Sequence, residues 1–152
     1  MKKLLLTLVG ISASLSAMAL SPFLEFQPVI AGGETCRFNV QAGIYEEMHP
    51  NFGLGAGFGI TEEWDFDHAP LLPIFVRGDV HGKMGSLKPF FSLDIGYAIN
   101  TEDTEWGAVV VNPMIGLNFG KWYGGIGYEA FCWTPKHAGS TSCFNMKIGY
   151  RF

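Results

Sequence analysis

The alternation of apolar with small or polar residues constrains this chain more than any other feature. The last nine residues show it best, with Phe144, Met146, Ile148, Tyr150 and Phe152 on one side and Asn145, Lys147, Gly149 and Arg151 on the other. Successive side chains of a β-strand point to opposite faces, so this period of two predicts a strand with one apolar face. No run of 18 apolar residues follows residue 20, which excludes a membrane-spanning helix there.

The same pattern recurs in eight segments and predicts an all-β chain. The expected strands are residues 24–30, 37–45, 52–60, 74–81, 91–100, 109–119, 125–130 and 144–152. The first strand is the weakest because it contains Pro28, which cannot donate a ladder hydrogen bond. The breaks between them are residues 31–35, 47–50, 62–70, 82–88, 101–105, 121–122 and 135–140.

The connections alternate in character along the chain. The first, third, fifth and seventh breaks are mostly longer and acidic, and meet at one end: they include Glu34, Glu62, Glu63, Asp65, Asp67, Glu102, Asp103 and Glu105. The other end includes a two-residue turn at Lys121 and Trp122. This asymmetry is typical of an eight-stranded antiparallel up-and-down transmembrane β-barrel with short periplasmic turns and longer acidic extracellular loops. Four inward polar pairs fit one register: Gln27 with Asn39, Arg77 with Asp94, Asp94 with Asn112, and Glu129 with Lys147.

Two kinds of barrel could carry such strands, and they differ in which face is outside. A soluble, lipocalin-like exported barrel would turn the apolar face inward around an apolar ligand, whereas a membrane barrel turns it toward lipid. The opposite face here is rich in glycine, and the chain has 20 glycines in 152 residues. Glycine suits the crowded interior of a narrow barrel better than a solvated strand surface. The composition therefore favours the membrane barrel.

The first nineteen residues are expected to be a cleaved signal peptide. Lys2 and Lys3 precede an apolar stretch, and Ala17 and Ala19 form a small-residue cleavage site. Cleavage leaves residues 20–152 as one barrel domain, and the absence of a nearby cysteine predicts no lipid anchor. A net charge of −4 without a basic cluster after Lys3 excludes nucleic acid as a partner.

Together these features resemble the small Gram-negative outer-membrane barrels of the OmpA/OmpX type, across residues 20–152. The resemblance rests on the signal peptide, the eight strands and the terminal sequence FNMKIGYRF. It implies location in the outer membrane and an insertion signal, read by the barrel-insertion machinery, at Phe144, Met146, Ile148, Tyr150 and Phe152. Because this fold hosts adhesins, structural proteins and lipid-modifying enzymes, the resemblance leaves the role open.

Charged residues on the inward face form the candidate site. They are Arg37, Arg77, Asp79, Asp94, Glu129, Lys147 and Arg151, with His81 on the same face. They could line a conduction path or form a network of ion pairs that plugs the lumen. Eight strands leave an interior just filled by side chains, and buried charges need partners, so we expect the plug and no general porin activity.

Catalytic and metal sites are not expected. Ser140 and Ser142 lie near His137, and resemblance to lipid A deacylase barrels draws attention to them, but no nucleophile motif surrounds them. A lipid-modifying enzyme is therefore kept only as an alternative. The acidic breaks lack the spacing of a calcium loop, and no cofactor is expected. The predicted role is structural, or a surface interaction through the loops of a monomer whose partners include outer-membrane lipid.

Cysteines and aromatic residues give two further expectations. Cys132 and Cys143 flank the last loop, but strand parity puts them on opposite faces, so unpaired thiols are favoured over a disulfide; Cys36 leaves the count odd. Aromatic side chains should mark the two membrane interfaces. The candidates are Phe52, Phe90, Phe119, Trp122, Tyr150 and Phe152 at the turn end, and Trp64, Phe66, Trp106 and Trp133 at the loop end.

Overall fold

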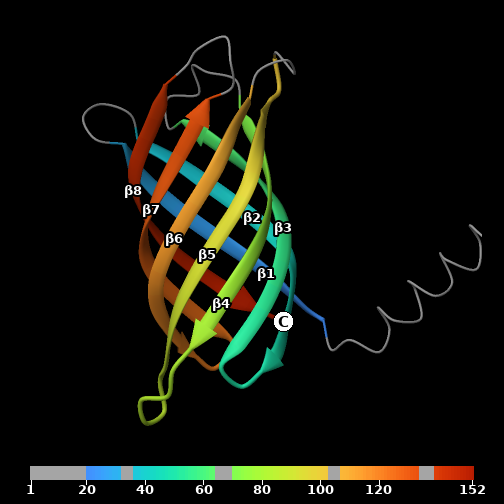
Figure 1. Ribbon diagram of the computed structural model, residues 1–152, viewed down its shortest axis with the longest axis vertical. Coiled ribbons are helices and arrows are strands. Elements are labelled where there is room, and N and C mark those ends of the chain that lie inside the picture. The colour runs from blue at the N-terminus through green and yellow to red at the C-terminus, as the bar shows by residue number, and fades with distance from the viewer. Residues whose placement is uncertain (1–19, 32–35, 64–69, 103–106, 134–138) are drawn as a thin grey trace, which may run out of the picture.

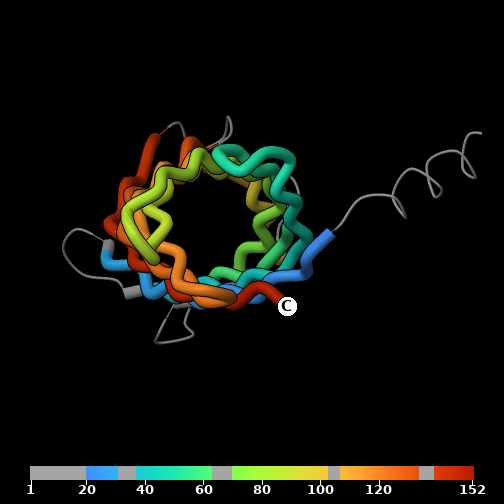
Figure 2. Tube along the Cα trace, turned by 90° about the horizontal axis from the view of Figure 1, so that it is seen from below, coloured from blue at the N-terminus to red at the C-terminus, as the bar shows by residue number. Residues whose placement is uncertain are grey.

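The chain forms a closed antiparallel β-barrel of eight strands, which confirms the predicted fold class. The computed structural model describes residues 20–31, 36–63, 70–102, 107–133 and 139–152. The strands are β1 (Ser21–Ala31), β2 (Cys36–His49), β3 (Phe52–Glu63), β4 (Leu71–His81), β5 (Lys88–Asn100), β6 (Gly107–Phe119), β7 (Trp122–Trp133) and β8 (Ser140–Arg151). Each strand pairs with its neighbour in sequence, and β1 closes the ring by pairing with β8 (Figures 1 and 2). The described part of the chain contains no helix long and apolar enough to cross a membrane.

The strands extend beyond their predicted ends because pairing continues into several of the predicted breaks. Phe119 pairs with Trp122, so the tight turn is Gly120–Lys121 and the prediction of Lys121–Trp122 was wrong by one residue. Gly120 has a φ of 71°, a left-handed conformation that glycine adopts without steric cost. Its freedom to turn sharply explains why the hairpin closes one residue earlier.

The register confirms three of the four predicted inward pairs. Gln27 pairs with Asn39, Arg77 with Asp94, and Asp94 with Asn112. The fourth pair was wrong, because Glu129 lies opposite Cys143, and Lys147 lies opposite Gly125. The last hairpin closes more tightly than expected, with the amide of Trp133 bonded to the Gly139 carbonyl oxygen at 3.1 Å. The shift is an even number of residues, so Glu129 and Lys147 still face the interior as the alternation predicted.

Apolar side chains cover the outside of the barrel, and polar side chains fill its interior. Exposed side chains on all eight strands form this outer belt, among them Leu24, Ile44, Phe58, Ile74, Val76, Ile95, Ile115, Ile126 and Ile148. Glycines let the interior close: a Cβ on Gly57 would lie 2.7 Å from the Phe75 ring and 2.8 Å from the Ala42 carbonyl oxygen. The interior is therefore as crowded as the glycine-rich face predicted.

Three prolines interrupt the ladder, each between a different pair of strands. Pairing lapses beside Pro28 between β1 and β8, beside Pro73 between β3 and β4, and beside Pro113 between β6 and β7. Proline has no amide hydrogen, so each one removes a donor from a central strand, where it is seldom found. The register is the same on both sides of each lapse, so these are local openings rather than bulges.

The aromatic side chains follow the predicted interfaces only in part. Phe52, Phe119, Trp122 and Phe152 are exposed on the outside of the turn end, with Tyr150 partly exposed among them. Phe90 was wrongly assigned, because it is buried in the interior against Tyr123. Trp133 lies at the loop end but stacks on the interior Phe131, at 5.8 Å between ring centroids. An aromatic residue on the inward alternation of a narrow barrel fills the lumen rather than the interface.

Several predicted features lie outside the described residues. These are the signal-peptide residues Ala17 and Ala19, and Glu34, Trp64, Asp65, Phe66, Asp67, Asp103, Glu105, Trp106 and His137. The side chains of Cys36 and Glu63 lie outside the described part as well.

Candidate functional site in the charged lumen

Four buried charges meet at the centre of the barrel. Arg77 on β4 donates two hydrogen bonds to Asp94 on β5, from Nε to Oδ1 at 2.6 Å and from Nη2 to Oδ2 at 2.7 Å. The same guanidinium binds both carboxylate oxygens of Glu25 on β1. The ammonium of Lys147 on β8 lies 3.3 Å from Glu25 and 3.3 Å from Asp94. Two acids and two bases thus satisfy one another across the lumen, and we call these four residues the central cluster.

Aromatic rings shield the central cluster from water. The guanidinium carbon of Arg77 lies 5.1 Å from the ring centroid of Phe23 and 5.3 Å from that of Phe75. The Tyr123 hydroxyl donates to Glu25 at 2.5 Å. Burying charges is costly unless they are paired and hydrogen-bonded, and here each has at least two partners. All four charges of the central cluster are therefore buried together with their partners.

A second ionic layer lies toward the turn end. Arg151 donates to Asp79 at 3.1 Å and stacks on the rings of Tyr45 and Tyr123, at 3.9 and 4.6 Å from their centroids. The Tyr45 hydroxyl lies 2.6 Å from Nε2 of His81. A polar mouth of about 210 Å³ opens below this layer. It is lined by Glu47, His81, Ser86, Lys88, Asn118, Gly120 and Arg151.

Amide side chains and then apolar side chains fill the lumen toward the loop end. Gln27 donates to Gln41 at 2.8 Å, and Asn145 donates to Asn112 at 3.1 Å. Asn39 donates to both carboxylate oxygens of Glu129 at 3.3 Å. Beyond this layer is a buried apolar cluster of Leu71, Ala98, Ala108, Val110 and Phe131, with Trp133 packed on it.

A void of about 10 Å³ lies next to Asp94, Asn112 and Glu129. Such a volume holds about one water molecule. Among the described residues, ion-paired, amide and apolar side chains thus follow one another in layers along the lumen.

All seven charged residues singled out from the sequence lie on the inward face. Asp79, Arg77, Asp94, Glu129 and Lys147 are buried, and Arg151 and Arg37 are partly buried. Sequence reasoning missed Glu25, which contacts both bases of the central cluster. The signal was present, because Glu25 shares the alternation of Gln27, which was placed inside. With Glu25 added to these seven residues, the set contains four acids and four bases.

The alternative catalytic residues are not brought together by anything in the described structure. Ser140 and Ser142 are exposed at the loop end of β8, and His137 lies outside the described residues. Cys132 is exposed and Cys143 is buried, and neither forms a disulfide. Among the described residues, no three His, Cys, Asp or Glu side chains are arranged to hold a metal ion.

Comparisons with known proteins give the fold. No family model matches the sequence, and no curated protein is significantly similar to it. Among solved structures, the outer-membrane enzyme PagL superposes with a TM-score of 0.61 at 12% identity, over 84% of this chain and 98% of that one. The N-terminal β-barrel domain of Pseudomonas aeruginosa OprF superposes with a TM-score of 0.55 at 12% identity, over 88% of this chain and 96% of that domain. The chain therefore has the eight-stranded fold of the small Gram-negative outer-membrane barrels, as its sequence predicted.

Proposed function

We propose that this protein is an integral outer-membrane barrel whose lumen is closed by paired polar side chains, with a structural or surface-interaction role. One observation carries the proposal: the barrel is inside out relative to a soluble protein. Leu24 and Ile148 are about half exposed, whereas Glu25 and Lys147 beside them are buried. Water would not favour such a surface, whereas lipid does, and closure of the barrel pairs the strand edges.

The same observation weighs against an exported carrier of an apolar ligand. Such a carrier needs an apolar cavity, but the centre of this lumen holds Glu25, Arg77, Asp94 and Lys147. The outer membrane also accounts for the signal peptide that we propose for residues 1–19. The proposed insertion signal agrees with this view, because Phe144, Met146, Ile148 and Phe152 are exposed on the outer face, with Tyr150 partly so.

Fractionation of a Gram-negative host that expresses the chain tests this proposal. We expect the protein in the outer-membrane fraction, soluble only in detergent, with a gel mobility that changes on boiling. Release as a soluble protein by osmotic shock would refute the proposal. If the protein hydrolyses lipid A, and Ser140→Ala or Ser142→Ala abolishes that activity, the enzyme alternative would replace the proposed structural role.

Planar-bilayer recording tests the closed lumen. We expect the purified, refolded protein to give no stable single-channel steps, because long side chains in successive layers cross an interior only eight strands wide. Steps that appear in Glu129→Ala, but not in the exposed-site control Ser142→Ala, would support the plug. Reproducible steps from the wild-type protein would contradict it.

A further inference from the structure

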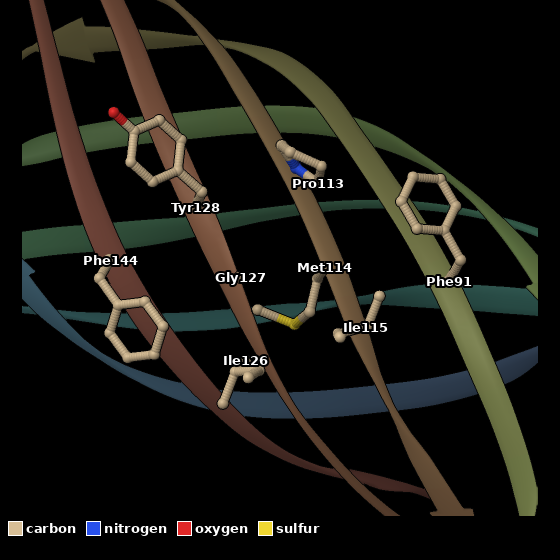
Figure 3. Close-up of a pocket in the computed structure, with 8 residues that line it drawn as sticks. All are labelled: Phe91, Pro113, Met114, Ile115, Ile126, Gly127, Tyr128 and Phe144. Carbon is tan, nitrogen blue, oxygen red and sulfur yellow. The ribbon is translucent and has the colours of Figure 1, made fainter.

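Two adjoining apolar hollows lie over the outside of β6 and β7. Their volumes are about 300 and 540 Å³, and both are lined by Ile115 and Ile126. The first hollow is lined by Phe91, Pro113, Met114, Ile115, Ile126, Gly127, Tyr128 and Phe144 (Figure 3). The second is lined by Pro89, Phe90, Ile115, Gly116, Leu117, Gly124, Gly125 and Ile126. We call their union the β6–β7 groove.

The groove lies where β7 has a glycine on its outer face and where strand pairing lapses beside a proline of β6. Gly124 faces outward, as Trp122 and Ile126 do, and its lack of a side chain leaves a gap in the outer belt. The Lys147 carbonyl oxygen, at 3.3 Å, is the one neighbouring atom within 4 Å of a Cβ built on Gly124. Farther along, the ladder lapses beside Pro113. Met114 extends from β6 toward β7 under this lapse and forms the floor (Figure 3).

The length of the groove suits one lipid acyl chain. It spans Pro113 to Leu117 on β6, about 14 Å at about 3.4 Å per residue. Strand tilt reduces this to about 10 Å of depth, which is less than half of an apolar band about 25 Å tall. Pro113 is the middle residue of β6 and Leu117 lies toward the turn end, so the groove stays within the leaflet at that end. Its open side faces the membrane interior that we propose around the barrel.

A basic side chain, Lys121, lies in the turn just beyond the groove. Lys121 is in the turn that joins β6 and β7, and its ammonium lies 5.8 Å from the ring centroid of Tyr150, beside Trp122. Residues 107–133 contain one acid, Glu129, which is buried in the lumen. The β2–β3 hairpin, in contrast, carries Glu46 and Glu47 at the same end. An anionic group is therefore favoured at the β6–β7 turn.

We infer that the β6–β7 groove binds one acyl chain of an anionic phospholipid from the leaflet at the turn end, with the lipid phosphate at Lys121. The inference rests on the proposed membrane placement. Trp122 and Phe119 flank the turn between the phosphate and the chain, where aromatic side chains mark the interface.

Native mass spectrometry of detergent-refolded protein, titrated with phosphatidylglycerol or phosphatidylcholine of identical chains, tests the site. We expect the wild type to retain one phosphatidylglycerol molecule and Gly124→Leu, which fills the groove, to lower the retained fraction at least about five-fold. Gly78→Leu is the matched control, because Gly78 also faces outward, with its nearest neighbour 4.0 Å away. Gly78→Leu should retain the lipid as the wild type does.

The headgroup is tested with Lys121→Gln against Lys83→Gln, a lysine in the β4–β5 turn. Only Lys121→Gln should reduce phosphatidylglycerol retention to the level of phosphatidylcholine. Equal retention by the two leucine variants, each with intact heat-shifted mobility, would overturn the groove but not the membrane placement. Wild-type protein that stays soluble without detergent would overturn both.

Discussion

Arg77→Met is expected to lower the free energy of unfolding by about 3–5 kcal/mol, the usual cost of removing one partner from a buried ion pair. Arg77 donates to Glu25 and Asp94 together, so its loss leaves two buried carboxylates with Lys147 as the remaining base of the central cluster. Methionine keeps much of the volume between Phe23 and Phe75. Reversible urea unfolding in lipid vesicles, followed by gel mobility, measures the change.

Two further variants separate the charge effect from a general loss of packing. Glu25→Gln added to Arg77→Met removes the excess negative charge, so the double variant should recover part of the loss. Lys88→Met breaks an exposed pair with Glu47 at 3.4 Å and should cost at most about 1 kcal/mol. A loss below about 1 kcal/mol for Arg77→Met would show that the central cluster does not stabilise the barrel.

The sequence was a good guide to which face each side chain occupies, because alternation is a local property of a strand. Register depends on where a turn closes, and this is why Glu129 was paired with the wrong partner. The register differed from the predicted one by an even number of residues, so the Lys147 side chain still lies in the lumen. The strand order could be predicted because short connections place strands that are consecutive in the sequence next to each other in the barrel.

Contacts across the lumen were harder to predict, because they join strands that are distant in sequence. Glu25, Arg77 and Lys147 come from β1, β4 and β8, and only barrel closure brings them together. Pro28 weakens the strand pattern of residues 24–30, the segment that carries Glu25. The β6–β7 groove likewise needs Gly124 and Pro113 on adjacent strands, a coincidence that no single segment of the sequence displays.

Val76→Arg should cost about 2–4 kcal/mol in a bilayer, the range for a cation at the midplane of a transmembrane barrel. Val76 is the middle residue of β4, faces outward and is 62% exposed. The same exposure in a water-soluble barrel would make the substitution nearly neutral, within about 0.5 kcal/mol. The free energy of unfolding in lipid vesicles therefore reports directly on what surrounds the outer belt.

Val80→Arg provides the depth control for this prediction. Val80 also faces outward on β4 but lies next to its last residue, where a cation reaches the interface and should cost about 0–1 kcal/mol. A large difference between the two variants requires a surrounding medium that becomes more apolar toward the middle of the barrel. Equal, small effects at both positions would mean that water surrounds the outer belt and would contradict the membrane placement. A partner protein would then be needed to cover the apolar side chains of the belt.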